Sequence, residues 1–241
     1  MAGHVECGEV PGLVTLVYRR GEAHADTIGA RAFGGNSMRR DTIFRVSSLT
    51  KPVAAAAAMV LVEDGRVRLD EPVDRLLPEL ADRRVLRRLD GPLDDTVPAK
   101  RPITLRDLLT LRMGFGFIMG PPDDYPILAA AEEQRLGMGP PKPATPHEPD
   151  EWIRRFATLP LMHQPGEQWM YEMGFAVLGV LISRASERPL EAFLRERIFG
   201  PLGMEDTGFH VPPEKLGRLA TCYRTNPETG ALEPYDGAED R

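Results

Sequence analysis

Ser48 and Lys51 form a Ser-x-x-Lys pattern, the pair in this chain whose types and spacing best suit nucleophilic chemistry. Residues three apart on a helix lie on one face, so the hydroxyl and the amine can meet. A serine hydroxyl becomes nucleophilic when a base takes its proton, and a lysine can be that base where burial and neighbouring positive charge favour the neutral amine. Ser47 has no such partner, because Thr50 stands three residues after it.

Two interpretations of this pair stay open on spacing alone. In the functional one, Ser48 attacks a carbonyl and its amide, at a helix amino terminus, helps to stabilise the developing negative charge. In the structural one, Ser48 caps the helix and Lys51 extends to solvent.

Other reactive groups are not indicated. The five histidines show no ligand spacing, there is no Cys-x-x-Cys, and neither a Gly-x-Ser-x-Gly elbow nor a phosphate-binding loop is present. We therefore expect no metal and no cofactor. Asp94-Asp95 and Asp123-Asp124 fall in loop-like stretches and are interpreted as solvated.

The element that must position Ser48 is a helix predicted from about Ser48 to Asp64. Its five alanines and flanking apolar residues cover every face, which is typical of a buried helix. Pro52 is acceptable only near the start of this helix, where amide groups still lack partners. Before it, strands at 13–18 and about 24–33 predict a β-hairpin.

After this helix the pattern is mainly helical, with long connections. Short helices are predicted at 105–109, capped by Thr104, and at about 150–158, 174–185 and 190–198. The stretch 120–149 holds eight prolines and is interpreted as a connection that forms a wall or lid. The expected division is 1–65 as the first part of an α/β domain, 66–225 as a mainly helical domain, and 226–241 as a polar, exposed chain end without a packing element.

Composition limits the function classes. The chain has 241 residues, a mass of 26.7 kDa, 42% hydrophobic residues and a net charge of -6, with a pI near 5.5. This balance does not favour nucleic-acid binding. Cys7 and Cys222 are expected to be reduced thiols. No apolar stretch has the length of a membrane helix and no secretory leader is visible, so we expect no membrane partner and a cytoplasmic location.

The surroundings of Ser48 resemble the penicillin-recognising serine hydrolases, within them the class C β-lactamase and family VIII carboxylesterase branch. Five stretches carry this resemblance in order: Phe44-Arg45-Val46-x-Ser48-x-Thr50-Lys51-Pro52, 69–79, 103–110, 165–171 and 201–209. The resemblance implies an α+β, β-lactamase/transpeptidase-like fold, with an antiparallel sheet flanked by helices and a mainly helical domain.

The resemblance also implies roles for residues. Ser48 matches the acylated nucleophile, Lys51 its base partner, and Tyr171 the tyrosine of the family's Tyr-x-Asn element, which shuttles the proton. Without that resemblance, Tyr171 is equally a packed aromatic beside Trp169. Glu172 and Met173 are expected on the substrate side.

Two departures from the family pattern bear on function. Met173 replaces the asparagine of the tyrosine element, and a thioether cannot donate a hydrogen bond, which favours ester over β-lactam substrates. Nothing after Tyr171 fits the family's third element, Lys-Thr-Gly or His-x-Gly; Lys215-Leu216-Gly217 is interpreted as surface. We therefore expect the C-terminal sheet strands to be absent from this chain and to come from a longer polypeptide or a second chain.

The function predicted is a serine hydrolase that works through an acyl-enzyme, most simply a carboxylesterase on short acyl esters, with a small ester or amide as substrate. The alternatives are a β-lactamase or D-amino-acid peptidase of the same fold, or an inactive fragment or degenerate homologue used for binding.

Overall fold

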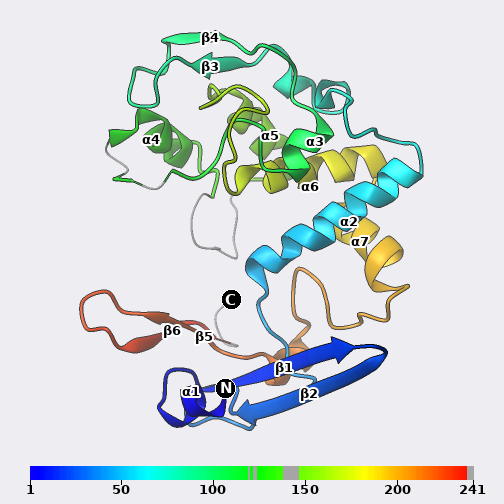
Figure 1. Cartoon of the computed structure of the whole chain (residues 1–241), viewed down its shortest axis with the longest axis vertical. Coiled ribbons are helices and arrows are strands. Elements are labelled where there is room, and N and C mark those ends of the chain that lie inside the picture. Colours follow the sequence, from blue (N-terminus) through cyan, green and yellow to red (C-terminus); the bar gives the residue numbers. More distant parts are fainter. Residues whose placement is uncertain (119, 122–123, 138–146, 238–241) are drawn as a thin grey trace. The chain divides into compact units, whose positions relative to one another are not determined.

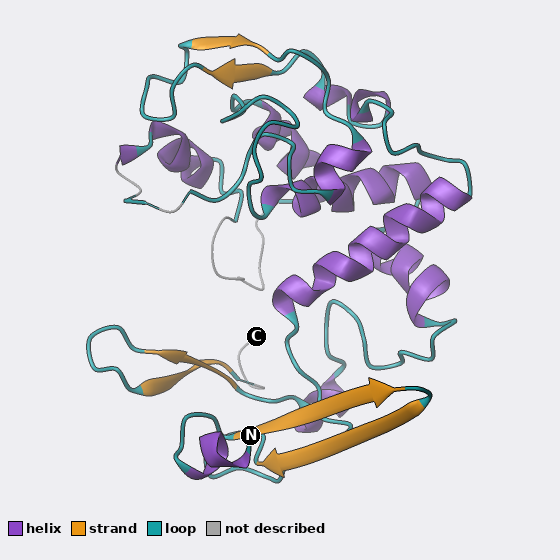
Figure 2. Cartoon of the chain, in the orientation of Figure 1, coloured by secondary structure: helices purple, strands orange, loops and turns teal. Residues whose placement is uncertain are grey.

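The computed structural model describes residues 1–118, 120–121, 124–137 and 147–237. They form two compact units, one of Met1–Val46 with Asp206–Arg241 and one of Ser47–Glu205. This division differs from the one expected at 65 and 225, because the helix predicted from about Ser48 to Asp64 groups with the helices that follow it. Helices and three two-stranded antiparallel sheets make the described part of the chain an α+β fold, as predicted (Figures 1 and 2).

The first unit is built on a β-hairpin. Strand β1 (Gly12–Arg19) pairs with β2 (Glu22–Gly29), and Arg20 and Gly21 between them have positive φ angles of 52° and 89°. A two-residue turn of this kind matches the twist of the strands it joins. The hairpin was predicted, but its second strand ends at Gly29 and not at Phe33. Gly29 has a φ of 76°, and the chain turns there.

The end of the chain contributes a second hairpin to this unit, which corrects the expectation of a polar end without a packing element. Strand β5 (Cys222–Thr225) pairs with β6 (Leu232–Asp236). Asp236 is buried and accepts a hydrogen bond from Arg45 Nη2 at 2.7 Å. This part of the chain end thus forms an ordered strand because its backbone has a strand to pair with and Asp236 has a cation to pair with. Helix α1 (Ala2–Glu6) and the short helix η6 (Pro213–Arg218) complete the unit.

The second unit holds most of the hydrophobic core. Helix α2 (Thr50–Glu63) follows the short helix η1 (Ser47–Leu49), so the helical region begins one residue before Ser48, close to the prediction. Pro52 is the third residue of α2, where its missing amide hydrogen costs no hydrogen bond. Ala57 and Ala58 are completely buried, and α2 packs against α6 (Met173–Ser186).

Helix α3 (Leu105–Leu109) also packs against α6. Its predicted cap is confirmed: Thr104 accepts from the Asp107 amide, and the Asp107 carboxylate accepts from the Thr104 amide. Asp107 is buried and also accepts two hydrogen bonds from Arg101, at 2.6 and 2.8 Å. Burial by itself raises the pKa of Asp107, but the hydrogen bonds from Arg101 and Thr104 outweigh burial and hold it below its usual range.

The remaining elements of this unit surround that core. They are η2 (Val73–Arg75), η3 (Pro78–Leu80), β3 (Arg84–Leu86), β4 (Thr96–Pro98), α4 (Pro126–Glu133), α5 (Pro149–Ala157), α7 (Leu190–Leu194) and the π-helical η5 (Arg195–Phe199). Strands β3 and β4 pair antiparallel. The helices predicted near 150–158, 174–185 and 190–198 are confirmed as α5, α6 and α7 with η5.

Helix α4 lies within the stretch 120–149, where the sequence predicted a connection that forms a wall or lid and no helix. Pro126 is the first residue of α4, a position where proline favours a helix instead of breaking one. Ile127 and Ala131 then bury one face of α4 in the core. The other prolines at 122, 140, 141, 143 and 146 lie outside the described residues, as does Asp123, so the wall or lid stays a prediction.

Candidate active site

Ser48, Lys51 and Tyr171 form one hydrogen-bonded cluster in the unit of Ser47–Glu205. Lys51 Nζ lies 3.0 Å from Ser48 Oγ and 2.9 Å from Tyr171 Oη, and the two hydroxyl groups are hydrogen-bonded to each other. Lys51 Nζ also lies 4.3 Å from the centroid of the Tyr171 ring. The structure therefore brings together the three residues expected to act on the substrate.

Two helix amino termini hold this cluster. Ser48 lies in η1 and Lys51 is the second residue of α2, while Tyr171 comes two residues before α6. Because α2 packs against α6, the side chains of Ser48, Lys51 and Tyr171 at the starts of these helices lie close together. The same helix ends favour negative charge on a reacting oxygen.

The backbone around Tyr171 is fixed by a neighbouring loop that the sequence did not single out. The Phe117 amide donates to the Tyr171 carbonyl, and the Met170 amide donates to the Leu111 carbonyl at 2.8 Å. A Cβ atom added at Gly116 would lie 2.5 Å from the Tyr171 carbonyl oxygen, so only glycine allows this approach. The Gly-Phe-Gly run at 114–116 is the signal that could have pointed to it.

Tyr171 is both a packed aromatic residue and a member of the hydrogen-bonded cluster. Its ring lies 6.1 Å from that of Trp169 at an interplanar angle of 30°, as a packed aromatic would. Its hydroxyl, however, is shared with Ser48 and Lys51. Hydrogen bonds from Lys51 and with Ser48 hold the pKa of Tyr171 below its usual range, and the nearby Glu172 carboxylate opposes this effect.

Glu172 and Met173, both expected on the substrate side, have different surroundings. Glu172 Oε2 lies 3.5 Å from Lys51 Nζ, so this carboxylate contacts the cluster of Ser48, Lys51 and Tyr171. Met173 is only 2% exposed and lies in the hydrophobic core, so its position corrects the expectation that it contacts substrate. As the first residue of α6, Met173 lies one turn before the buried Val177, and the two share the core face of α6.

The other polar groups weighed in the sequence lie elsewhere. Lys215 is on η6, where Nζ pairs with Asp206 at 2.8 Å, and Asp95 pairs with Arg87 at 3.1 Å. Cys7 and Cys222 are free thiols. Within the described residues, no group of three or more His, Cys, Asp or Glu side chains is arranged to hold a metal ion. None of the helices in the described ranges is long and apolar enough to cross a membrane.

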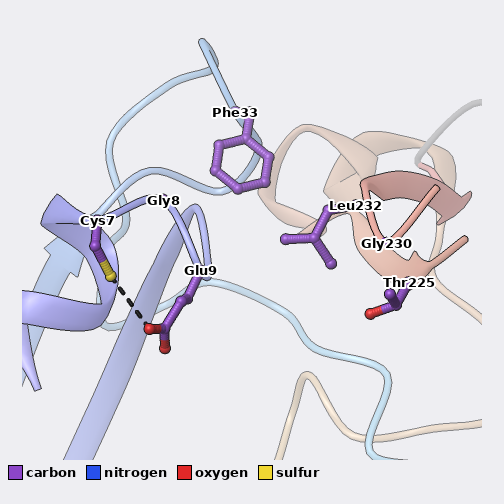
Figure 3. A pocket seen from close by; sticks show the side chains of 7 residues that line it. All are labelled: Cys7, Gly8, Glu9, Phe33, Thr225, Gly230 and Leu232. Atoms are coloured by element: carbon purple, nitrogen blue, oxygen red, sulfur yellow. Dashed lines mark hydrogen bonds between the residues drawn. The ribbon is translucent and has the colours of Figure 1, made fainter.

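A pocket in the unit of Met1–Val46 and Asp206–Arg241 is lined by Cys7, Glu9, Phe33 and Leu232, among others (Figure 3). The Cys7 thiol donates to Glu9 Oε1 at 3.4 Å. This pocket contains none of the candidate catalytic residues and plays no part in the chemistry considered below.

The α+β fold and the cluster of a serine, a lysine and a tyrosine are those of a β-lactamase-like protein. The chain belongs to the beta-lactamase family, which matches residues 1–241. It is 42% identical over 223 residues to Protein Rv1367c of Mycobacterium tuberculosis, covering 91% of this chain and 52% of that protein. It is 35% identical to esterase EstB of Burkholderia gladioli, covering 83% of this chain and 46% of EstB.

A solved structure agrees with these relatives. EstCE1, described as a hydrolase with promiscuous acyltransferase activity, is 27% identical and superposes with a TM-score of 0.80, covering 98% of this chain and 57% of EstCE1. The chain thus spans about half the length of the relatives it matches.

Proposed function

We propose that this chain carries the catalytic serine of a hydrolase that acts on small esters through an acyl-enzyme. The observation that carries the proposal is the mutual hydrogen bonding of Ser48, Lys51 and Tyr171. A helix cap and a solvated lysine would not require a tyrosine 123 positions away to share the serine hydroxyl. A nucleophile and a base within hydrogen-bond reach, with a third group orienting them, is the arrangement that activates serine.

In the proposed reaction, Ser48 Oγ bonds to the ester carbonyl carbon as its proton passes to the phenolate oxygen of Tyr171, whose pKa is lowered by the hydrogen bond from Lys51. The intermediate then collapses, the carbon–oxygen bond to the alcohol breaks, and the alcohol leaves with the proton from Tyr171. Water repeats these steps on the acyl group and frees Ser48. The Ser48 amide, at the start of the helical region, is proposed as one donor to the negatively charged oxygen.

Simple esters are favoured over β-lactams by the side chains beside Tyr171. Where the family's tyrosine element has an asparagine, this chain has Met173, which is buried in the core and has no hydrogen-bond donor, so no side-chain amide is offered from this position. The name of one similar protein, esterase EstB, agrees with ester chemistry, and EstCE1 is described as a hydrolase.

Acyl transfer is a second candidate function. EstCE1 is described as having promiscuous acyltransferase activity. The acyl-enzyme would be the same, but an alcohol in place of water would accept the acyl group. Hydrolysis and transfer are distinguished by adding a short alcohol to an ester assay and measuring the ratio of new ester to free acid.

The experiment that tests the nucleophile is intact mass spectrometry of the full-length protein after exposure to a fluorophosphonate. We expect one adduct, which is lost in Ser48→Ala and kept in Ser47→Ala, the matched control at the neighbouring exposed serine. An adduct that survives in Ser48→Ala, or no adduct on folded protein, would contradict the proposal and favour a binding role.

The substrate class is tested by comparing 4-nitrophenyl acetate with a chromogenic cephalosporin. We expect turnover of the ester that depends on Ser48 and little or no opening of the lactam ring. Faster turnover of the cephalosporin would assign the protein to the β-lactamase alternative.

A further inference from the structure

Trp169 is a large aromatic side chain that lies open to solvent beside the candidate active site. It is 57% exposed, whereas Trp152, the other tryptophan of the chain, is 7% exposed and stacks on Phe156 in the core. The Trp169 ring contacts the Tyr171 ring, with 6.1 Å between their centroids. An aromatic surface is thus open to a ligand next to the hydroxyl group that Tyr171 shares with Ser48.

Two further exposed apolar side chains belong to residues that adjoin the cluster. Leu49 follows Ser48 in η1, and the Phe117 amide donates to the Tyr171 carbonyl. Of the five large apolar side chains that are exposed in the described part of Ser47–Glu205, three therefore belong to residues next to Ser48 or in contact with Tyr171. A single exposed apolar residue is ordinary, but several that gather beside reactive groups indicate a surface that binds a ligand.

The part of the substrate nearest to Trp169 follows from the proton transfer in the proposed reaction. Tyr171 returns its proton to the oxygen of the leaving alcohol, so that oxygen lies about 2.6–3.2 Å from Tyr171 Oη at this step. The acyl carbon, in contrast, is bonded to Ser48 Oγ. Because Trp169 contacts the ring of Tyr171, the group carried by the alcohol oxygen is the part of the ester expected beside Trp169.

An indole ring binds apolar groups, and aromatic groups above all. Aromatic rings attract each other in offset or edge-to-face contacts, and both rings lose water when they meet. Trp169 has more than half of its surface free for such a contact, and a methyl group would cover little of it. The alcohol part of the substrate is therefore expected to be larger than methyl and aromatic or similarly apolar.

We propose that Trp169 is a specificity-determining residue that binds an aromatic or similarly apolar group on the alcohol side of the ester. The inference rests on the proposed function and names the kind of alcohol that the site selects. In acyl transfer the same surface holds the acceptor alcohol. Its O–H bond breaks as its oxygen bonds to the acyl carbon, and the proton joins the phenolate oxygen of Tyr171. The bond from the acyl carbon to Ser48 Oγ then breaks, and Oγ takes the proton from Tyr171.

Binding at Trp169 can be measured without any enzymatic activity, because the chain has two tryptophans and only Trp169 is exposed. Acrylamide quenches the fluorescence of an exposed indole more than that of a buried one, so quenching of the wild type reports mainly on Trp169. We expect benzyl alcohol to reduce this quenching and methanol at the same concentration to leave it unchanged. In Trp169→Phe only Trp152 emits, and benzyl alcohol should not alter its quenching. If benzyl alcohol protects Trp169 no better than methanol does, the proposal is wrong whether or not the protein hydrolyses esters.

Selection of the alcohol is tested by offering benzyl alcohol and methanol together to the acetyl-enzyme formed from 4-nitrophenyl acetate. Both alcohols react with the same acyl-enzyme, so the initial ratio of benzyl acetate to methyl acetate does not depend on the amount of active protein. We expect Trp169→Ala to lower this ratio about tenfold, and Trp169→Phe, which keeps an aromatic ring, to lower it by less than about threefold. Because Trp169 is exposed, neither substitution removes a side chain from the core.

Met59→Ala is the matched control, since Met59 is an exposed apolar residue of the same unit and lies about 12 Å along α2 from Lys51. It should leave the product ratio unchanged. An unchanged ratio in Trp169→Ala would overturn the proposal, and a parallel loss of both products would mean that Trp169 only holds Tyr171 in place. A protein that forms no fluorophosphonate adduct at Ser48 would count against the proposed function, and the acrylamide measurement would still decide whether Trp169 binds the alcohol.

Discussion

Lys51 Nζ lies 2.9 Å from Tyr171 Oη, although the two residues are 120 positions apart in the chain. The contact joins the first turn of α2 to the turn before α6, so the reactive cluster exists only once these two helices have packed. Tyr171 receives a hydrogen bond from Lys51 and shares another with the Ser48 hydroxyl, which is the environment of a phenol that exchanges protons readily.

Replacing Tyr171 by phenylalanine tests the proton transfer. The ring still packs beside Trp169, but the hydroxyl shared with Ser48 is lost. We expect fluorophosphonate labelling and ester hydrolysis to slow by about 10²- to 10⁴-fold, the usual contribution of general acid–base catalysis. Tyr18→Phe, on an exposed position of β1, is the control and should leave both rates unchanged. Equal rates in Tyr171→Phe and wild type would remove Tyr171 from the mechanism.

The pKa of the Tyr171 hydroxyl should depend on the hydrogen bond from Lys51. Hydrogen bonds from Lys51 and with Ser48 lower the pKa of Tyr171, so the phenolate is present at lower pH than for a free tyrosine, whose pKa is about 10. Lys51→Met removes the strongest of these bonds. We therefore expect the pKa of Tyr171 to rise and the acid limb of activity to move to higher pH. Tyrosinate absorbance against a Tyr171→Phe reference measures this, and Lys100→Met should not move it.

Asp107 should contribute stability that depends on pH. Its pKa is lowered in the folded protein, so the ionised form stabilises the fold above the unfolded pKa near 4, and this is lost as pH falls through the folded value. Asp107→Asn should cost about 2 kcal/mol in urea unfolding near neutral pH, since it weakens the cap of α3 and the bonds from Arg101. The difference from wild type should shrink at acid pH. Asp70→Asn, at the exposed partner of Arg106, should change stability less; an equal loss would argue against the role of burial.

Gly116 should be intolerant of a side chain. A Cβ atom there would meet the Tyr171 carbonyl oxygen at 2.5 Å and the Met170 Cβ at 2.7 Å. Gly116→Ala must therefore move the loop or Tyr171, and we expect a loss of about 1–3 kcal/mol with slower labelling of Ser48. Gly179→Ala is the control, because its nearest neighbour would be at an ordinary 3.4 Å and alanine favours the middle of α6. Normal labelling in Gly116→Ala would show that the loop does not position Tyr171.

The parts of the fold that local signals determine were predicted from the sequence. Helix α2 follows from an unbroken run of small apolar residues, and α3 from the cap of Thr104 and Asp107. Helix α4 was missed because its first residue is one proline among many, and only burial of Ile127 and Ala131 distinguishes it from a connection. Strand β6 was missed because its five residues include a proline and two acidic residues, and its pairing with β5 is not visible in its own sequence.

Part of the candidate site could likewise be predicted from the sequence, and part of it could not. The spacing of Ser48 and Lys51 predicts their contact because one helical turn joins them. That Glu172 contacts Lys51 depends on the path of the chain before α6, and that Met173 is buried depends on which face of α6 meets the core. Neither follows from residue type, since both depend on the packing of helices distant in sequence.

The alanine run of α2 has a consequence for how substitutions distant from the cluster should act. Ala57 and Ala58 have no exposed surface, so a larger residue there can only push α2 away from its neighbours. Because α2 moves as one body, such a shift would also move Ser48 and Lys51 away from Tyr171. The reactivity of Ser48 should therefore depend on how tightly α2 packs against its neighbours. Variants selected for faster or slower catalysis can be expected to carry changes at buried alanines as well as at the reacting groups.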